Sequence, residues 1–131
     1  VEKHDRPELA TQPVIVGGLP ENRGVVASCC YIARRFGVRS AIPSRRALQL
    51  CPQAVFVLPR FDRYREISRQ IRAVFHEVTD RVEPLSLDEA YLDVSENKLG
   101  ERLAGRVAQW IRSEIRSRTG LTASAGTSSH A

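Results

Sequence analysis

Apolar residues recur every three or four positions between residues 62 and 78, and this spacing constrains the fold more than any other feature of the sequence. The apolar positions are Tyr64, Ile67, Ile71, Val74, Phe75 and Val78. Charged and polar residues fill the positions between them, so the pattern predicts a long amphipathic helix with one buried face. Asp62 has the side chain of a helix N-cap. Such a helix needs a second layer of structure to pack against.

A second amphipathic stretch lies nearer the C-terminal end of the sequence. Its apolar positions are Leu99, Leu103, Val107, Trp110, Ile111 and Ile115. Gly120 supplies a stop signal for this helix. Between the two stretches, residues 82–85 and 90–94 are predicted to form a hairpin, and residues 121–127 are predicted to form a further strand. Helix, hairpin, helix and strand together predict an antiparallel-rich sheet backed by two long helices.

The first sixty residues contain shorter elements. Strands are predicted near residues 13–16, 25–26 and 54–58, and a turn over residues 19–24. Short helices are predicted over residues 30–36, ended by Gly37, and 44–50, preceded by Pro43. Residues 1–11 are polar and lack a clear period. The pattern predicts an α/β (α+β) fold with a small lobe over residues 1–60 and a second part over residues 61–131.

Composition is that of an ordinary globular protein, with 42% hydrophobic and 27% charged residues. No apolar run reaches the roughly 18 residues of a membrane span, and no signal peptide opens the sequence. The three cysteines, Cys29, Cys30 and Cys51, have no metal-ligand spacing and predict small buried thiols in a reducing compartment. We therefore expect a cytoplasmic protein.

Positive charge is concentrated in one window. Residues 22–61 contain no Asp or Glu, and the arginines of this window are Arg23, Arg34, Arg35, Arg39, Arg45, Arg46 and Arg60. The window therefore carries a charge of +7. Since the net charge of the whole sequence is +5, the remaining residues together carry 5 − 7 = −2. Forked guanidinium donors suit phosphate oxygens, although a biased genome composition produces the same excess of arginine without function.

Two adjacent carboxylates, Asp88 and Glu89, separate the two strands of the predicted hairpin. Consecutive strand residues point to opposite faces, so the two side chains can converge only if the backbone bends there. Carboxylates held close together repel unless a cation compensates them, and Mg²⁺ prefers oxygen ligands. The residues leave two interpretations open, a solvated turn and a divalent-cation site.

The nine residues from Ser86 to Val94 closely resemble the motif S-[LI]-D-E-A-Y-L-D-[VI] of the Y-family translesion DNA polymerases, particularly their DNA polymerase IV (DinB) branch. The resemblance implies that Asp88 and Glu89 are metal-binding catalytic carboxylates of a palm domain. It also implies two Mg²⁺ ions per active site and template-directed addition of deoxynucleotides to a primer 3′ end, in DNA damage tolerance and repair.

A second motif lies in the first lobe. Residues 28–40 are similar to the family's fingers motif [ST]-x-N-Y-x-A-R-[KR]-x-G-[VI]. The resemblance implies that Ser28, Tyr31 and Arg34 contact the triphosphate of the incoming nucleotide. The residues alone fit equally a surface helix with a half-buried tyrosine. Cys30 stands where the family usually has Asn, which leaves the helix start less well capped.

The resemblance extends from Val1 to Ser128, and it implies fingers over residues 1–60 and most of a palm over residues 61–131. The family's first palm strand, with its remaining catalytic Asp, would precede Val1, and the thumb and little finger would follow Ala131. Ala131 occupies the position of a triphosphate-binding Lys, and His130 precedes it. These 131 residues alone are therefore expected to be inactive.

The implied partners are primed DNA and deoxynucleoside triphosphates at the bacterial nucleoid, with a sliding clamp contacted through regions outside this sequence. Two other classes stay open. A non-catalytic DNA-binding relative is favoured by Cys30 and Ala131, and intact Mg²⁺ binding would argue against it. A palm-like nucleotidyl cyclase shares the fold, and dependence on a DNA template would separate it from a polymerase.

Overall fold

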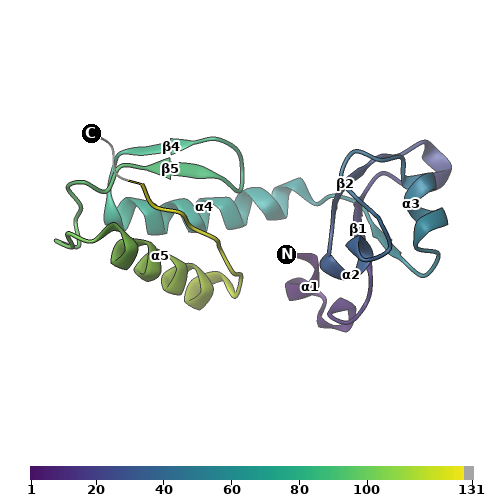
Figure 1. Ribbon diagram of the computed structural model, residues 1–131, viewed down its shortest axis with the longest axis horizontal. Coiled ribbons are helices and arrows are strands. Elements are labelled where there is room, and N and C mark those ends of the chain that lie inside the picture. Colours follow the sequence, from purple (N-terminus) through teal and green to yellow (C-terminus); the bar gives the residue numbers. More distant parts are fainter. Residues whose placement is uncertain (129–131) are drawn as a thin grey trace. The chain divides into compact units, whose positions relative to one another are not determined.

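The structure is a computed structural model that describes residues 1–128, and the chain in it divides into two compact units. The first unit is Val1–Arg60, and the second begins at Phe61. Figure 1 shows the elements of each unit along the chain. The fold is mixed α/β, as the sequence predicts. The predictions for His130 and Ala131 concern residues outside the described range. No helix in the described part of the chain is long and apolar enough to cross a membrane.

The first unit is built on a mixed three-stranded sheet of order β2-β1-β3. Its strands are β1 (Val14–Gly17), β2 (Val26–Cys29) and β3 (Val55–Val57). Strand β1 pairs antiparallel with β2 and parallel with β3. The helices are α1 (Glu2–Asp5), η1 (Pro7–Leu9), η2 (Pro20–Asn22), α2 (Tyr31–Arg34) and α3 (Ser44–Leu50). The predicted strands at 13–16 and 54–58 and the predicted helix at 44–50 are confirmed.

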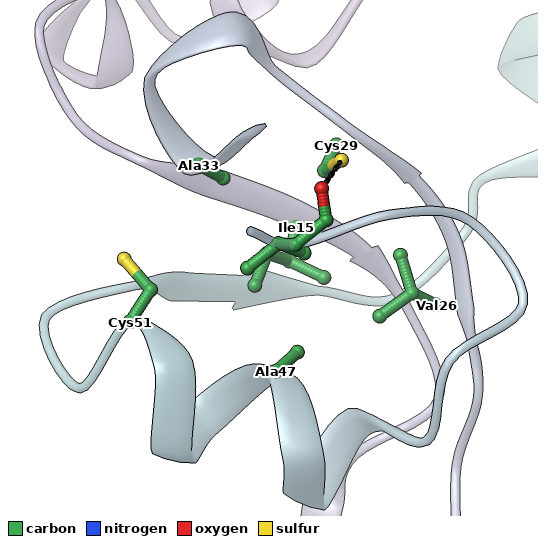
Figure 2. Close-up of a cluster of buried hydrophobic side chains, with 7 residues drawn as sticks. Ile15, Val26, Cys29, Ala33, Ala47 and Cys51 are labelled. Carbon is green, nitrogen blue, oxygen red and sulfur yellow. Dashed lines mark hydrogen bonds between the residues drawn. The ribbon is translucent and has the colours of Figure 1, made fainter. Parts of the chain in front are cut away.

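The core of the first unit surrounds Ile15, which is fully buried on the central strand. Figure 2 shows side chains from β1, β2, α2 and α3 gathered around it. The residues of this core are Ile15, Val26, Cys29, Ala33, Val38, Ala47 and Cys51. The backbone at Gly18 and the backbone at Gly24 lie so close together that neither position has room for a side chain. A Cβ on Gly24 would lie 2.1 Å from the carbonyl carbon of Gly18. Only glycine fits that approach.

The second unit consists of two long helices and a hairpin. Its elements are α4 (Phe61–Val78), β4 (Val82–Pro84), β5 (Ala90–Leu92) and α5 (Ala104–Thr119). In Figure 1 the hairpin runs along α4, and α5 lies beside the same helix. The buried core joins both helices through Val74, Val78, Val107, Ile111 and Ile115, and Leu92 of β5 packs on it. The amphipathic patterns therefore predict the buried faces correctly.

Two details of the long helices differ from the prediction. Helix α4 already begins at Phe61, so Asp62 lies inside its first turn and pairs with Arg65 instead of capping the helix. Helix α5 begins at Ala104, so Leu99 and Leu103 are not part of its buried stripe. The side-chain amide of Asn97 explains the later start, because it makes four hydrogen bonds to backbone groups of three neighbouring residues and holds a loop in place.

The predicted strand at residues 121–127 is wrong for this structure. Among the described residues, the second unit has only the two-stranded sheet β4-β5, and residues 121–128 belong to no strand. A segment counts as a strand only when its backbone forms a ladder with a neighbour, and the apolar pattern by itself does not supply that neighbour. Ala123 still packs on the core of the second unit.

Candidate active site

The adjacent carboxylates lie at the bend of the hairpin, as their position between two predicted strands indicates. The backbone N–H groups of Leu85 and Ser86 both donate to the carbonyl oxygen of Glu89, at 2.9 and 3.3 Å. These bonds close the bend directly before β5. Asp88 and Glu89 are both exposed. The hydroxyl of Ser86 donates to Asp88 Oδ1 at 2.8 Å, which restrains that carboxylate.

Helix α4 holds this bend through a buried hydroxyl. Ser68 is 5% exposed, and its Oγ donates to the carbonyl oxygen of Leu87 at 2.6 Å. One turn later, Arg72 donates to the carbonyl oxygen of Ser86 at 3.5 Å. Neither contact was predicted from the sequence. The only signal was a hydroxyl residue beside the apolar stripe of a helix, directly after Ile67.

A second buried hydroxyl holds the open end of the hairpin. Thr79 lies just after α4 and is 4% exposed. Its Oγ1 donates to the carbonyl oxygen of Asp93 at 2.9 Å and accepts from the backbone N–H of Arg81 at 3.1 Å. The hairpin is therefore attached to the same helical segment at both ends, which fixes the position of the acidic bend relative to α4.

The carboxylate oxygens at the bend suit a hard divalent cation that also binds waters or substrate phosphates. Asp88 and Glu89 supply carboxylate oxygens, and within residues 1–128 no group of three or more His, Cys, Asp or Glu side chains could hold a metal ion. Mg²⁺ commonly uses one or two carboxylates together with waters and substrate phosphates, so two exposed carboxylates fit this mode of binding.

Asp93 is the next carboxylate along the hairpin, and it is already engaged. Its Oδ1 accepts from the backbone N–H of Ser95 at 3.0 Å, and its Oδ2 lies 3.4 Å from Arg81. The N–H of Ser95 is the main cause that lowers the pKa of this carboxyl, and Arg81 adds to the effect. Asp93 therefore stabilises the hairpin locally.

Of the three residues predicted to bind the triphosphate, two are in contact with each other. The guanidinium carbon of Arg34 lies 5.3 Å from the centroid of the Tyr31 ring, within the range of a cation–π contact. The Tyr31 side chain is 79% exposed on α2. Ser28 is exposed on β2, where it pairs with Val16 of β1. All three lie in the first unit, whereas the acidic bend belongs to the second.

Cys30 directly precedes α2 and attaches it to the sheet. The backbone N–H of Val14 donates to Cys30 Sγ at 3.2 Å, and the thiol lies 3.6 Å from the carbonyl oxygen of Gln12. No side-chain hydrogen bond caps α2, as the cysteine at this position predicts. Burial raises the pKa of the Cys30 thiol, but backbone N–H groups, that of Val14 foremost, lower it overall. The thiol thus holds Tyr31 and Arg34 near β1.

One arginine of the basic window does not contribute a free charge. Arg60 contacts Glu2 Oε2 at 2.8 Å and Asp5 Oδ2 at 2.7 Å, and the hydrogen bonds that it donates to these carboxylates raise the pKa of its guanidinium. The charge of +7 in this window therefore includes one arginine that is paired within the first unit. The sequence could not show this pairing, because its two acids lie more than fifty residues away. The other arginines of the window are all exposed, and they are Arg23, Arg34, Arg35, Arg39, Arg45 and Arg46.

Sequence comparison connects the whole chain to one family. The family model impB/mucB/samB matches residues 1–131. The chain is 64% identical over 128 residues to DNA polymerase IV of Exiguobacterium sibiricum and 57% identical to DNA polymerase IV of Halorhodospira halophila. Each alignment covers 98% of this chain and 36% of the relative, so the chain spans about a third of the length of these relatives.

Structural comparison agrees with the sequence. The fold matches DinB from Sulfolobus solfataricus with a TM-score of 0.84 and 31% identity, over 92% of this chain and 36% of that one. It matches a Y-family DNA polymerase chimera, Dbh-Dpo4(243-245)-Dbh, with a TM-score of 0.83 and 30% identity at the same coverage. The resemblance to Y-family polymerases of the DNA polymerase IV type is thereby confirmed, and the chain belongs to the impB/mucB/samB family.

Proposed function

We propose that this chain is the fingers (residues 1–60) and most of the palm (from residue 61) of an error-prone, translesion-type DNA-directed DNA polymerase. The observation that carries the proposal is the acidic bend. Asp88 and Glu89 stand in a nine-residue match to the family's motif, and a buried hydroxyl of α4 holds the bend in place. Relatives with 54–64% identity that are named DNA polymerase IV support it.

In this proposal Asp88 and Glu89 hold two Mg²⁺ ions together with substrate phosphates. Such ions lower the pKa of a bound hydroxyl and neutralise charge on transferred and leaving phosphates. The protein's own contribution is to keep two carboxylates adjacent in spite of their repulsion. Ser86 restrains Asp88 by a hydrogen bond, and the bonds from Leu85 and Ser86 to the Glu89 carbonyl fix the backbone between them.

Tyr31, Arg34 and Ser28 are the proposed contacts to the triphosphate of the incoming nucleotide. A guanidinium offers five N–H donors in a fixed plane, and its position over the Tyr31 ring restricts the directions in which they point. The exposed hydroxyls of Tyr31 and Ser28 can add neutral hydrogen bonds. Together these groups would orient the nucleotide for attack without changing its chemistry.

Primed DNA and deoxynucleoside triphosphates are the proposed substrates. A solved relative whose fold matches this chain with a TM-score of 0.82 is an insertion ternary complex of Dbh DNA polymerase. The exposed arginines of the first unit are suited to a polyanion. Work at the bacterial chromosome in DNA repair, and contact with a sliding clamp through segments outside these residues, belong to the same proposal.

The experiment that tests the proposal is primer extension by a full-length polymerase that carries this chain. The chain replaces the aligned segment of the Exiguobacterium sibiricum relative, to which it is 64% identical. We expect the chimera to add the nucleotide complementary to each of the four template bases in the presence of Mg²⁺. An unprimed template is the control and should give no product.

Two results would contradict the proposal. A folded chimera that binds primed DNA but adds no nucleotide would identify a non-catalytic DNA-binding relative. A product that forms from nucleotide alone, without a template, would identify a nucleotidyl cyclase. That the 131 residues alone do not extend a primer stays a prediction, and the same assay on the purified chain checks it.

A further inference from the structure

The hairpin has two chemically different faces. Leu92 packs on the helical core and Val82 opposite it is half-buried, whereas Glu83 and Tyr91 form the next cross-strand pair and both are exposed. Side chains alternate along a strand, so Tyr91 points away from α4 and α5. We call the surface formed by Glu83, Glu89, Tyr91 and Asp93 the outer face. Tyr91 is 67% exposed at the centre of β5.

The outer face continues directly into the acidic bend. Glu89 precedes Tyr91 by two residues, so the two side chains emerge on the same face about 7 Å apart. The bonds from Ser68 and Thr79 hold both ends of the hairpin, and therefore the spacing between the ring and the carboxylates is fixed. The exposed Tyr91 ring therefore lies beside the acidic bend on this face.

Charge limits what can lie on this face. Glu83, Glu89 and Asp93 contribute three negative charges, and Arg81 is paired with Asp93 at 3.4 Å. A phosphate backbone would be repelled here. The sugars and base edges of a nucleic acid carry no charge, and an aromatic ring offers them a flat apolar surface.

We propose that Tyr91 is a positioning residue that contacts the sugar and base edge at the 3′ end of the primer strand and so directs its hydroxyl toward Asp88 and Glu89. This inference rests on the proposed function, because it takes the acidic bend as the place where the primer end reacts. The ring, and not the phenol hydroxyl, makes the contact. Tyr91 lies beside the reacting atoms and has no part in proton transfer.

The test uses the chimeric polymerase with substitutions that distinguish the effect of the Tyr91 ring from any effect on the stability of β5. Tyr91→Phe keeps the ring, and Tyr91→Thr and Tyr91→Val remove it while keeping a residue type that suits a strand. We expect both ring-less variants to raise the Kd for primed DNA about fivefold to tenfold, as measured by fluorescence anisotropy. The KM for the nucleotide and the melting temperature should stay unchanged. Tyr91→Phe should bind primed DNA within about twofold of the parent.

Each outcome decides between the two claims. If the parent chimera extends primers and the ring-less variants bind primed DNA as tightly as it does, this inference is wrong and the proposed function stands. A loss of affinity in Tyr91→Phe equal to that of the ring-less variants would also overturn it, because the hydroxyl would then carry the contact. If the parent chimera extends no primer, the proposed function fails, and this inference fails with it.

Discussion

At the scale of single residues, Arg34 is distinguished from its neighbours by its position over the Tyr31 ring. Arg35 follows it on the chain and is also exposed. The two side chains carry the same charge. If Arg34 contributes more to nucleotide binding than Arg35 does, the cause is therefore the fixed orientation of the Arg34 guanidinium and not the positive charge of the window alone.

We expect a substitution of Arg34 to weaken nucleotide binding and the same substitution of Arg35 to have little effect. In the chimeric polymerase, Arg34→Lys should raise the KM for the incoming nucleotide about tenfold, because an ammonium keeps the charge but loses the planar set of donors. Steady-state primer extension measures this. Arg35→Lys is the matched control and should change the KM less than twofold. Equal effects of the two substitutions would show that only charge matters there.

The three thiols should differ in reactivity. Hydrogen bonds from backbone N–H groups lower the pKa of Cys30, whereas burial raises the pKa of Cys51. Cys29 and Cys51 are buried, and Cys30 is partly exposed. Since the thiolate is the reacting form, iodoacetamide at pH 7.5 should label Cys30 first, and labelling should rise with pH. Mass spectrometry of the folded chain identifies the site. Faster labelling of Cys51 would contradict this.

At the scale of elements, the hairpin and α4 form one unit because buried hydroxyls on the helical segment reach both ends of the hairpin. Ser68 bonds to the bend and Thr79 to the open end. The two residues are eleven positions apart, a distance of roughly 16 Å along a helix. Their partners Leu87 and Asp93 are six positions apart, a distance of at most about 20 Å along an extended chain, so the helical segment sets where the bend lies.

Removing either hydroxyl should loosen the hairpin. Ser68→Ala leaves the Leu87 carbonyl without its partner and should cost about 1 kcal/mol of unfolding free energy. Urea denaturation followed by circular dichroism measures the change. Ser113→Ala on the exposed face of α5 is the matched control and should cost less than about 0.5 kcal/mol. A smaller loss at Ser68 than at Ser113 would show that the buried bond does not stabilise the bend.

An ion pair joins the two long helices and makes their packing sensitive to acid. Arg118 of α5 donates to Glu77 of α4 at 3.0 Å and also contacts Glu114. This guanidinium holds the pKa of Glu77 below its ordinary value of 4.5. A carboxylate whose pKa is lowered by folding stabilises the protein above its unfolded pKa, and this stabilisation is lost as the pH falls through the folded value.

The acid sensitivity can be assigned to Glu77 by substitution. Between pH 7 and pH 3 the melting temperature of the parent chain should fall further than that of Glu77→Gln, which lacks the ion pair at both pH values. Thermal unfolding followed by circular dichroism at a series of pH values checks this. Glu96→Gln, an exposed carboxylate in the loop after β5, should behave as the parent does. Identical pH profiles for the parent and Glu77→Gln would refute the assignment.

At the scale of the whole molecule, the sequence predicts the periodic elements well. Helix α4, the hairpin and the core of the second unit are confirmed because their apolar spacing reflects burial directly. The bend at Asp88 and Glu89 is confirmed for the same reason. Their role as metal ligands stays a prediction, as does the role of the arginine and tyrosine on α2.

What the sequence could not predict depends on contacts between distant residues. The pairing of Arg60 with Glu2 and Asp5 joins positions far apart in the chain, and no local pattern indicates it. The late start of α5 depends on one amide, Asn97, binding several backbone groups at once. A strand at residues 121–127 was expected from its composition, but a strand also needs a neighbouring strand, which composition does not encode.

The proposed polymerase depends most on Asp88 and Glu89 as its metal-binding carboxylates. The most direct test is single-turnover primer extension by the chimeric polymerase with both carboxylates replaced, Asp88→Asn and Glu89→Gln, and with Glu96→Gln as the control. We expect the double substitution to slow extension about a thousandfold or more while primed DNA still binds. Extension at the rate of the parent in the double variant would contradict it.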